Sequence, residues 1–136
     1  MKIWYGFGSE HSANLVMIGQ FQDVTQAARA KEVIDRITQQ VEADAQAGQM
    51  EIGGHTDRYS DAMLDLLAQV KAHSILPTEL EQFAYSVRVE TKGDRVVIRT
   101  DEVDVSAFMK VLLDNGARVE VFSADRFPQG EGDNED

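Results

Sequence analysis

Apolar residues recur along the chain with two periods, one typical of strands and one typical of helices. Alternating or clustered apolar residues predict strands at 2–7, 14–21, 83–90, 96–99 and 118–122. Apolar residues three and four positions apart predict helices at 24–47, 61–73 and about 105–115. The stretch at 14–21 is apolar enough to be a central strand of a sheet.

The residues that flank the long first helix predict where it begins and ends. Asp23 is a natural N-cap with Gln26 in the capping-box position, and Gly48 suits the residue just beyond the C-terminus. One apolar stripe of this helix consists of Ala30, Ile34, Ile37 and Val41.

Similar signals delimit the later helices. Ser60 is expected to cap the second helix, and Asp101 or Asp104 to cap the third. Between them, Thr78 to Glu81 predicts a capping box for one short turn after Pro77. The predicted apolar face of the second helix consists of Met63, Leu64, Leu67 and Val70.

From residue 14 onward the order is strand, helix, helix, strand, strand, helix, strand. Without the middle helix this order is βαββαβ, the ferredoxin-like or split-βαβ arrangement. We therefore predict an α+β fold in which helices cover one face of an antiparallel sheet, with an extra N-terminal strand and an inserted helix. Residues 1–127 are expected to form this single domain. The acidic stretch 128–136 has no apolar anchor and is expected to be a disordered tail.

The charge of the chain narrows the classes of partner. The net charge is -11 and the isoelectric point is near 4.6, which disfavours nucleic acid and anionic membranes as partners. A basic protein would be attracted instead. The chain contains no cysteine, so disulfides and thiolate metal sites are excluded. With no signal peptide or long apolar segment, a cytoplasmic location is expected.

The N-terminal stretch also carries a resemblance. Lys2-Ile3-Trp4, followed by Gly6 and then Gly8-Ser9-Glu10-His11-Ser12, resembles a bacterial family of unknown function. The stretches 86–88, 99–102 and 116–121 are similar to that family too. The resemblance implies a small bacterial protein and carries no activity, cofactor or functional residue with it.

Two polar loops form the candidate chemical site. Histidine is scarce, and Glu10-His11 and His55-Thr56-Asp57 each place an imidazole beside a carboxylate, with Ser9 adjacent to the first pair. Such groups suit a divalent metal or acid–base chemistry. The spacing matches no metalloenzyme motif and no nucleophile elbow, so neither a metal nor another cofactor is expected.

An aromatic cluster at the N-terminus is the candidate interface. Strand alternation puts Trp4 on one face and Tyr5 and Phe7 on the other. One face of this strand is expected to pack into the core. The aromatic side chains on the other face would then be exposed anchors of the kind that protein interfaces favour. An exposed sheet edge, at the first or the last strand, would also allow a homodimer.

The leading functional hypothesis is a small acidic interaction module, such as an inhibitor, an immunity factor or a regulatory subunit, without catalysis. The alternative is a small metal-binding or hydrolytic enzyme that uses the Glu10/His11 and His55/Asp57 loops together. A sensor of a small ligand is the third candidate, because ferredoxin-like folds often hold a pocket between sheet and helices.

Overall fold

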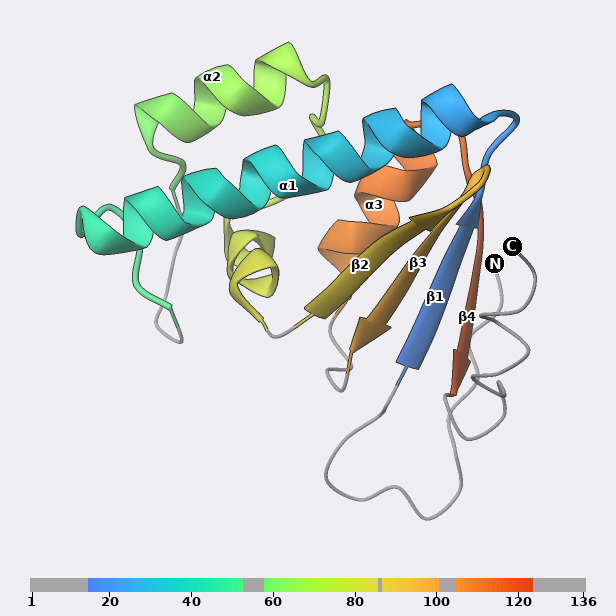
Figure 1. Cartoon of the computed structure of the whole chain (residues 1–136). Coiled ribbons are helices and arrows are strands. Elements are labelled where there is room, and N and C mark those ends of the chain that lie inside the picture. Colours follow the sequence, from blue (N-terminus) through green and yellow to red (C-terminus); the bar gives the residue numbers. More distant parts are fainter. Residues whose placement is uncertain (1–14, 53–57, 86, 101–104, 124–136) are drawn as a thin grey trace.

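The computed structural model describes residues 15–52, 58–85, 87–100 and 105–123, and the elements in these ranges form an α+β fold (Figure 1). The structure describes four strands, three α-helices and one 3₁₀ helix. In chain order they are β1 (Leu15–Gln20), α1 (Val24–Gln46), α2 (Asp61–Gln69), η1 (Pro77–Ala84), β2 (Val87–Lys92), β3 (Arg95–Thr100), α3 (Ser106–Asp114) and β4 (Arg118–Ser123).

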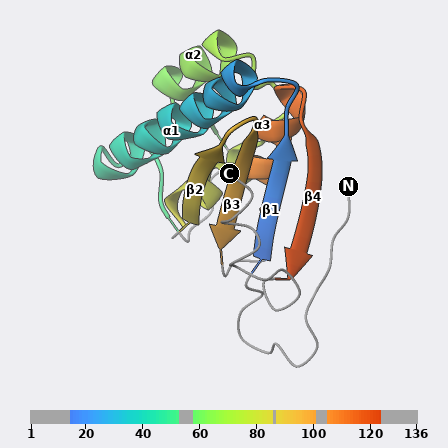
Figure 2. The same ribbon diagram turned by 45° about the vertical axis from the view of Figure 1, so that its right-hand side comes forward.

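The four strands form one antiparallel sheet in the order β2-β3-β1-β4 (Figure 2). The strand β1 is central, as its apolar sequence predicts, and it pairs Met17 with Ile98 of β3 and Val121 of β4. Because β1 and β2 are both antiparallel to β3, they run parallel to each other on its two sides. A two-residue turn joins β2 to β3, and Gly93 takes a positive φ of 62° there, a conformation that tight hairpin turns need and that glycine adopts readily.

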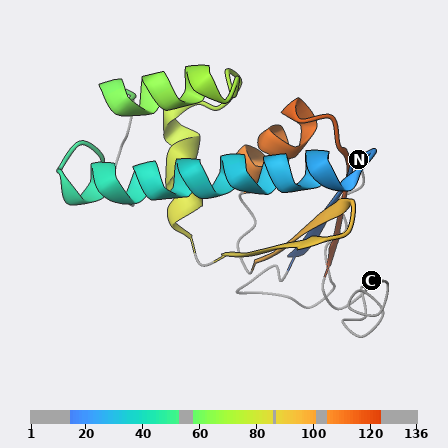
Figure 3. The same ribbon diagram turned by 45° about the horizontal axis from the view of Figure 1, so that its top comes forward.

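The three α-helices lie on one side of the sheet (Figure 3). Alternate strand residues, including Met17, Ile98 and Val121, point to this side and join a core with buried residues of α1 and α3. The sequence predicts helices on one face of an antiparallel sheet, and the described residues confirm that layering. None of the described helices is long and apolar enough to cross a membrane.

The long helix α1 follows its sequence signals closely. The Gln26 backbone N–H donates to Asp23 Oδ1 at 2.8 Å, which is the predicted N-cap. At the other end, Gly48 has a φ of 77° just beyond the helix. The predicted apolar stripe is buried throughout: Ala30, Ile34, Ile37 and Val41.

The helix α2 packs on the half of α1 that extends beyond the sheet (Figure 1). Ser60 caps it as predicted, since its Oγ accepts from the Met63 N–H at 3.0 Å. The same hydroxyl donates to Asp44 of α1 at 2.8 Å, and this carboxyl is buried. The predicted apolar face is wrong at one position: Leu64 is 49% exposed, whereas Leu66 is buried.

Three sequence-based boundaries are wrong. The helix α2 ends at Gln69 and does not reach His73. The strand predicted from residue 83 begins at Val87, because Phe83 belongs to η1, where it is buried. The predicted Thr78 capping box is shifted by two residues, since Glu79 Oε1 instead accepts from the Leu76 N–H at 2.8 Å. Alternation of apolar residues cannot separate a strand from a short helical turn that precedes it.

The start of α3 also differs from the sequence prediction. Its N-cap residue is Val105, which offers no side-chain hydrogen bond. The Ala107 N–H in the first turn donates instead to Oε1 of Gln82, a buried residue of η1, at 2.8 Å. The predicted caps Asp101 and Asp104 lie outside the described residues. A side chain distant in sequence therefore satisfies the first turn of α3.

The helix α3 lies very close to β1 at Gly19. A side chain at this position would place its Cβ 3.1 Å from Cδ1 of Leu112, which is fully buried, and 3.4 Å from Cβ of Ala117. A larger residue would require the buried Leu112 side chain to shift by a few tenths of an ångström, so glycine favours the close packing of α3 on this central strand.

Several sequence predictions concern parts of the chain that the structure does not describe. These are the N-terminal strand at 2–7 and the tail at 128–136, so both stay predictions. Among the described strands, β2 and β4 are the edges of the sheet. The strand β4 corresponds to the last predicted strand, one of the two proposed dimer edges, and the homodimer itself stays a prediction.

Candidate functional site

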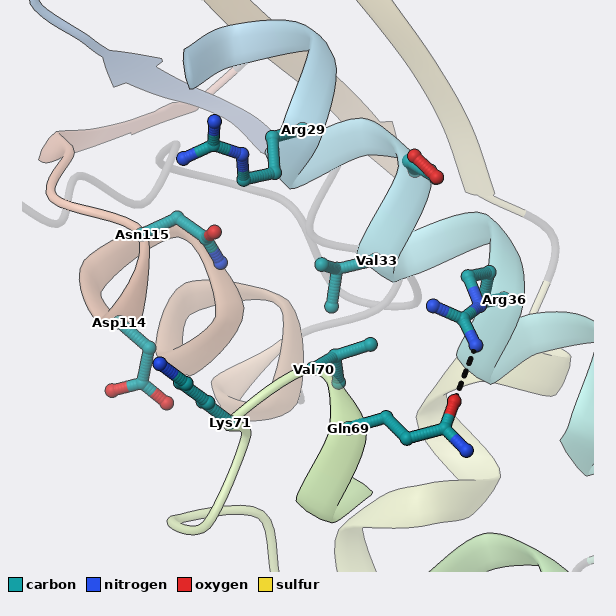
Figure 4. Close-up of a pocket in the computed structure, with 9 residues that line it drawn as sticks. Arg29, Val33, Arg36, Gln69, Val70, Lys71, Asp114 and Asn115 are labelled. Carbon is teal, nitrogen blue, oxygen red and sulfur yellow. Dashed lines mark hydrogen bonds between the residues drawn. The ribbon is translucent and has the colours of Figure 1, made fainter. Parts of the chain in front are cut away.

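A cleft of about 380 Å³ opens where α1 meets the C-terminal ends of α2 and α3 (Figure 4). We call it the cationic cleft, because three of its lining residues are bases. Its lining residues are Arg29, Glu32, Val33, Arg36, Gln69, Val70, Lys71, Asp114 and Asn115. They come from three elements far apart in the sequence.

The helix α1 supplies one wall of the cleft through helical periodicity. Arg29, Val33 and Arg36 lie four and three positions apart, so they share one face of the helix. Val33 is buried and forms the apolar floor between the two guanidinium groups. Nη2 of Arg36 donates to Oε1 of Gln69 at 2.9 Å, which connects α1 to the last residue of α2. This bond uses one of the five N–H donors of a guanidinium.

The end of α2 places Lys71 in an unusual backbone conformation. Its φ is +59°, in the left-handed region that favours glycine. The Ala72 N–H donates to the Leu67 carbonyl at 2.9 Å and the Lys71 N–H to the Ala68 carbonyl at 3.3 Å, which is a Schellman motif. A lysine in this conformation lowers the free energy of unfolding by about 1 kcal/mol relative to glycine. Figure 4 shows its side chain running toward the end of α3, where Asp114 and Asn115 lie.

The polar groups of the cleft are mostly hydrogen-bond donors. The three bases are accompanied by two carboxylates, Glu32 and Asp114, so the lining has a formal charge of +1 in a chain with a net charge of -11. Guanidinium, ammonium and side-chain amide N–H groups bind oxyanions such as carboxylate or phosphate. The arrangement therefore suits recognition of an anion.

A polar network supports the α3 side of the cleft. Glu79 of η1 accepts from Nζ of Lys110 at 2.6 Å and from Oγ of Ser106 at 2.6 Å. Nζ of Lys110 also donates to the Ser74 carbonyl at 2.7 Å, and Oγ of Ser74 donates to Asp114 at 3.0 Å. The network thus links η1 and α3 to one of the cleft carboxylates.

Acidification is expected to weaken the fold through Glu79. Burial raises the pKa of this carboxyl, but hydrogen bonds from the Leu76 N–H, Lys110 and Ser106 outweigh burial and hold the pKa below its ordinary value of 4.5. A carboxyl with a lowered pKa stabilises the folded chain above the unfolded pKa, and this contribution disappears as the pH falls through the folded pKa. The melting temperature should therefore fall on acidification below pH 4.5.

The measurement compares the wild type with Glu79→Gln by thermal denaturation from about pH 7 to about pH 3. The variant should be less stable at neutral pH, and the difference should shrink as the pH falls. Glu42→Gln, which removes an exposed carboxyl of α1, is the matched control. A difference between wild type and Glu79→Gln that does not change with pH would show that Glu79 does not cause the acid sensitivity.

The residues that the sequence singles out lie outside the described part of the chain. This applies to the candidate polar site, Ser9, Glu10, His11, His55 and Asp57, and to the candidate aromatic interface, Trp4, Tyr5 and Phe7. Both sites stay predictions. Among the described residues, no group of three or more histidine and acidic side chains is placed to hold a metal ion.

Sequence reasoning missed the cationic cleft. The sequence places Arg29 and Arg36 on the polar side of an amphipathic helix, and a solvated surface explains such residues equally well. One signal in the sequence did point to the cleft: Arg29 and Arg36 are seven residues apart with Val33 between them, so all three share one face of the helix. Their meeting with Lys71 depends on how α2 packs against α1, which periodicity does not reveal.

Comparison with known protein families gives a match over nearly the whole chain. The model of a family of unknown function (DUF6375) matches residues 1–134. This agrees with the resemblance that the sequence shows to a family of unknown function, whereas the bacterial source stays a prediction. No curated protein and no solved structure has a significant match to the chain.

Proposed function

The chain belongs to this family of unknown function, and we propose from its geometry that it is a non-catalytic interaction module. Its cationic cleft would receive a carboxylate of a partner protein, either an acidic side chain or a chain terminus. Charge-assisted hydrogen bonds from Arg29, Arg36 and Lys71 would hold that group. A volume of about 380 Å³ suffices for one anchoring side chain.

The conformation of Lys71 carries this proposal. Residues held in sparsely populated backbone regions are enriched at binding and catalytic sites, where function retains them against their cost. Glycine would end α2 in the same motif at lower free energy. The chain has lysine there instead, and its side chain runs across one side of the cleft toward Asp114 at the end of α3.

The surroundings of the cleft support the expected basic partner. The two helices that border the cleft, α1 and α2, also carry exposed acids: Glu32, which lines the cleft itself, and Asp35, Asp61 and Asp65. A partner with basic residues around one carboxylate anchor would match this pattern of charge. Its association would be steered by long-range attraction and would slow at higher salt.

Lys71→Gly is the decisive variant, because fold and function should respond in opposite directions. The free energy of unfolding should rise by about 1 kcal/mol, since glycine relieves the left-handed backbone. Binding should weaken roughly tenfold or more, since a hydrogen bond to a charged group contributes about 1.5–3 kcal/mol. The measurements are urea denaturation and titration calorimetry with a partner captured from lysate and then purified.

Lys31→Ala is the matched control, because it removes an equal charge from α1 outside the cleft. It should leave affinity nearly unchanged. If Lys71→Gly binds the purified partner as tightly as the wild type, the cleft is not the recognition site.

A small-ligand sensor is the second candidate, and the same cleft favours it. Its volume lies within the range of pockets for small molecules. Titration with acetate, phosphate and an acidic peptide, followed by NMR shifts of the Arg29 and Arg36 side chains, separates the two functions. Saturation by phosphate alone would favour the sensor. The enzyme alternative, with Glu10/His11 and His55/Asp57, stays a prediction.

We also propose the ferredoxin-like, split-βαβ classification of the fold. The order β2-β3-β1-β4, with β1 and β2 parallel on either side of β3, supports it. The helix α2 is then the inserted helix. A cytoplasmic location in a bacterium is likewise a proposal.

A further inference from the structure

The sheet has a second face, away from the helices, that is basic although the chain is acidic. Five of its outward residues are bases and two, Glu90 and Glu120, are acids, a formal charge of +3. The remaining described residues contain six bases and twelve acids, a formal charge of -6. The five bases are Arg88, Lys92, Arg95, Arg99 and Arg118.

The register of the strands places like charges directly opposite each other. Arg88 of β2 lies opposite Arg99 of β3, and Lys92 lies opposite Arg95. Like-charged pairs across neighbouring strands destabilise a sheet. The two pairs concentrate positive charge on this side of the sheet, and such a concentration attracts acidic groups. The salt bridge from Arg88 to Glu90, at 3.3 Å, stays within one strand, and both side chains are at least 38% exposed.

The centre of the basic face is apolar and sheltered from water. Val16 of β1 and Val97 of β3 point to this side, and their exposed fractions are 1% and 5%. The described helices all lie on the other side (Figure 3). The described helices are therefore not what keeps water away from Val16 and Val97.

We propose that the acidic C-terminal segment of the chain, residues 124–136, folds back over this basic face. The segment contains five acids and one base, a formal charge of -4 that complements the +3 of the face. It contains no apolar residue after Phe127. Its attraction to the face is therefore mainly electrostatic, and Phe127 is the residue available to cover the apolar centre.

The chain can reach the whole face from the end of β4. This strand ends at Ser123, next to the end of the sheet that carries Arg88 and Arg99. The bases Lys92, Arg95 and Arg118 lie four residues farther along the strands, or about 13 Å. The eight residues from 124 to 131 span up to roughly 26–29 Å when extended. The acids from Glu131 onward therefore reach the far bases.

The family match extends through residue 134, so the acidic segment belongs to the region that the chain shares with its family. A docked segment would also keep nucleic acids and other polyanions off the only basic surface among the described strands. It would make access to that surface depend on salt and on competing acidic chains.

A spin label near the C-terminus tests the proposal in the full chain. Because the chain contains no cysteine, Asn134→Cys gives a single attachment site without changing the charge. The label should broaden the methyl signals of Val16, Ile18 and Val97, and should spare Val41, a buried residue of α1 on the other side of the sheet. Broadening should diminish at high salt and in the variant Arg95→Glu. Unbroadened Val16 and Val97 signals at low salt would overturn the proposal.

Two further samples identify any other occupant. A label at Lys2→Cys that broadens Val16 and Val97, when the Asn134 label does not, would assign the face to the N-terminal segment. The second sample mixes isotope-enriched chains that carry no spin label with spin-labelled chains that are not enriched. If the Val16 and Val97 signals broaden in this mixture but not within a single labelled chain, a second copy of the chain covers the basic face as a dimer. Either result would overturn the proposed docking.

Discussion

Replacing Phe108 by alanine should lower the free energy of unfolding by roughly 3–5 kcal/mol, the usual cost of removing a fully buried aromatic ring. Phe108 is 2% exposed, and its ring centroid lies 4.8 Å from that of Phe83. It lies where α3 meets η1 and α1. The cavity left by alanine would be enclosed by three elements that hold one another in place.

Urea denaturation measures this loss, with Leu113→Ala on the same helix as the control. Leu113 is 49% exposed, so its truncation should change stability by less than about 0.5 kcal/mol. Similar effects from both substitutions would contradict the central place of Phe108. If the neighbouring side chains move in to fill the cavity in Phe108→Ala, the loss of free energy of unfolding should lie near about 3 kcal/mol, the lower end of the expected range.

Replacing Gln82 by methionine should cost about 1–3 kcal/mol although the volume is nearly preserved, because it leaves a buried N–H without its acceptor. Gln82 is 1% exposed, and its Oε1 accepts from the Ala107 N–H at the start of α3. Its Nε2 donates to Oγ of Ser106 at 3.1 Å. Methionine fills the space and provides neither bond.

Hydrogen exchange at the Ala107 amide distinguishes this mechanism from a general loss of packing. In Gln82→Met, protection should fall most in the first turn of α3. Gln39→Met, an exposed substitution on α1, is the matched control and should leave both stability and exchange nearly unchanged. Loss of protection spread evenly over the core would show that Gln82 does not act as the cap of α3.

The sequence predicts those elements whose boundaries depend on neighbouring residues. Asp23 and Gly48 delimit α1 because a cap and a left-handed terminus are local chemistry. The turn at Gly93 is local for the same reason. These signals, with the order of elements, were sufficient for an antiparallel sheet covered by helices.

The remaining features depend on contacts between distant parts of the chain. Gln82 caps a helix that begins 24 residues later along the chain, so no local pattern at α3 could indicate it. Leu64 and Leu66 both suit an amphipathic helix, and only the position of α1 decides which one is buried. The cationic cleft requires three helix surfaces to meet, which a periodicity cannot predict.

Lys71 has a consequence for how this sequence would change under selection. A library varied at this position and sorted for heat resistance alone should converge on glycine, because that residue relieves the left-handed backbone. Sorting the same library for capture of the partner should retain lysine. The two enrichment profiles would diverge at residue 71 and agree at Gly48, where φ is also positive but no ligand group is required. Divergence between such profiles would locate binding residues in other members of the family by selection alone.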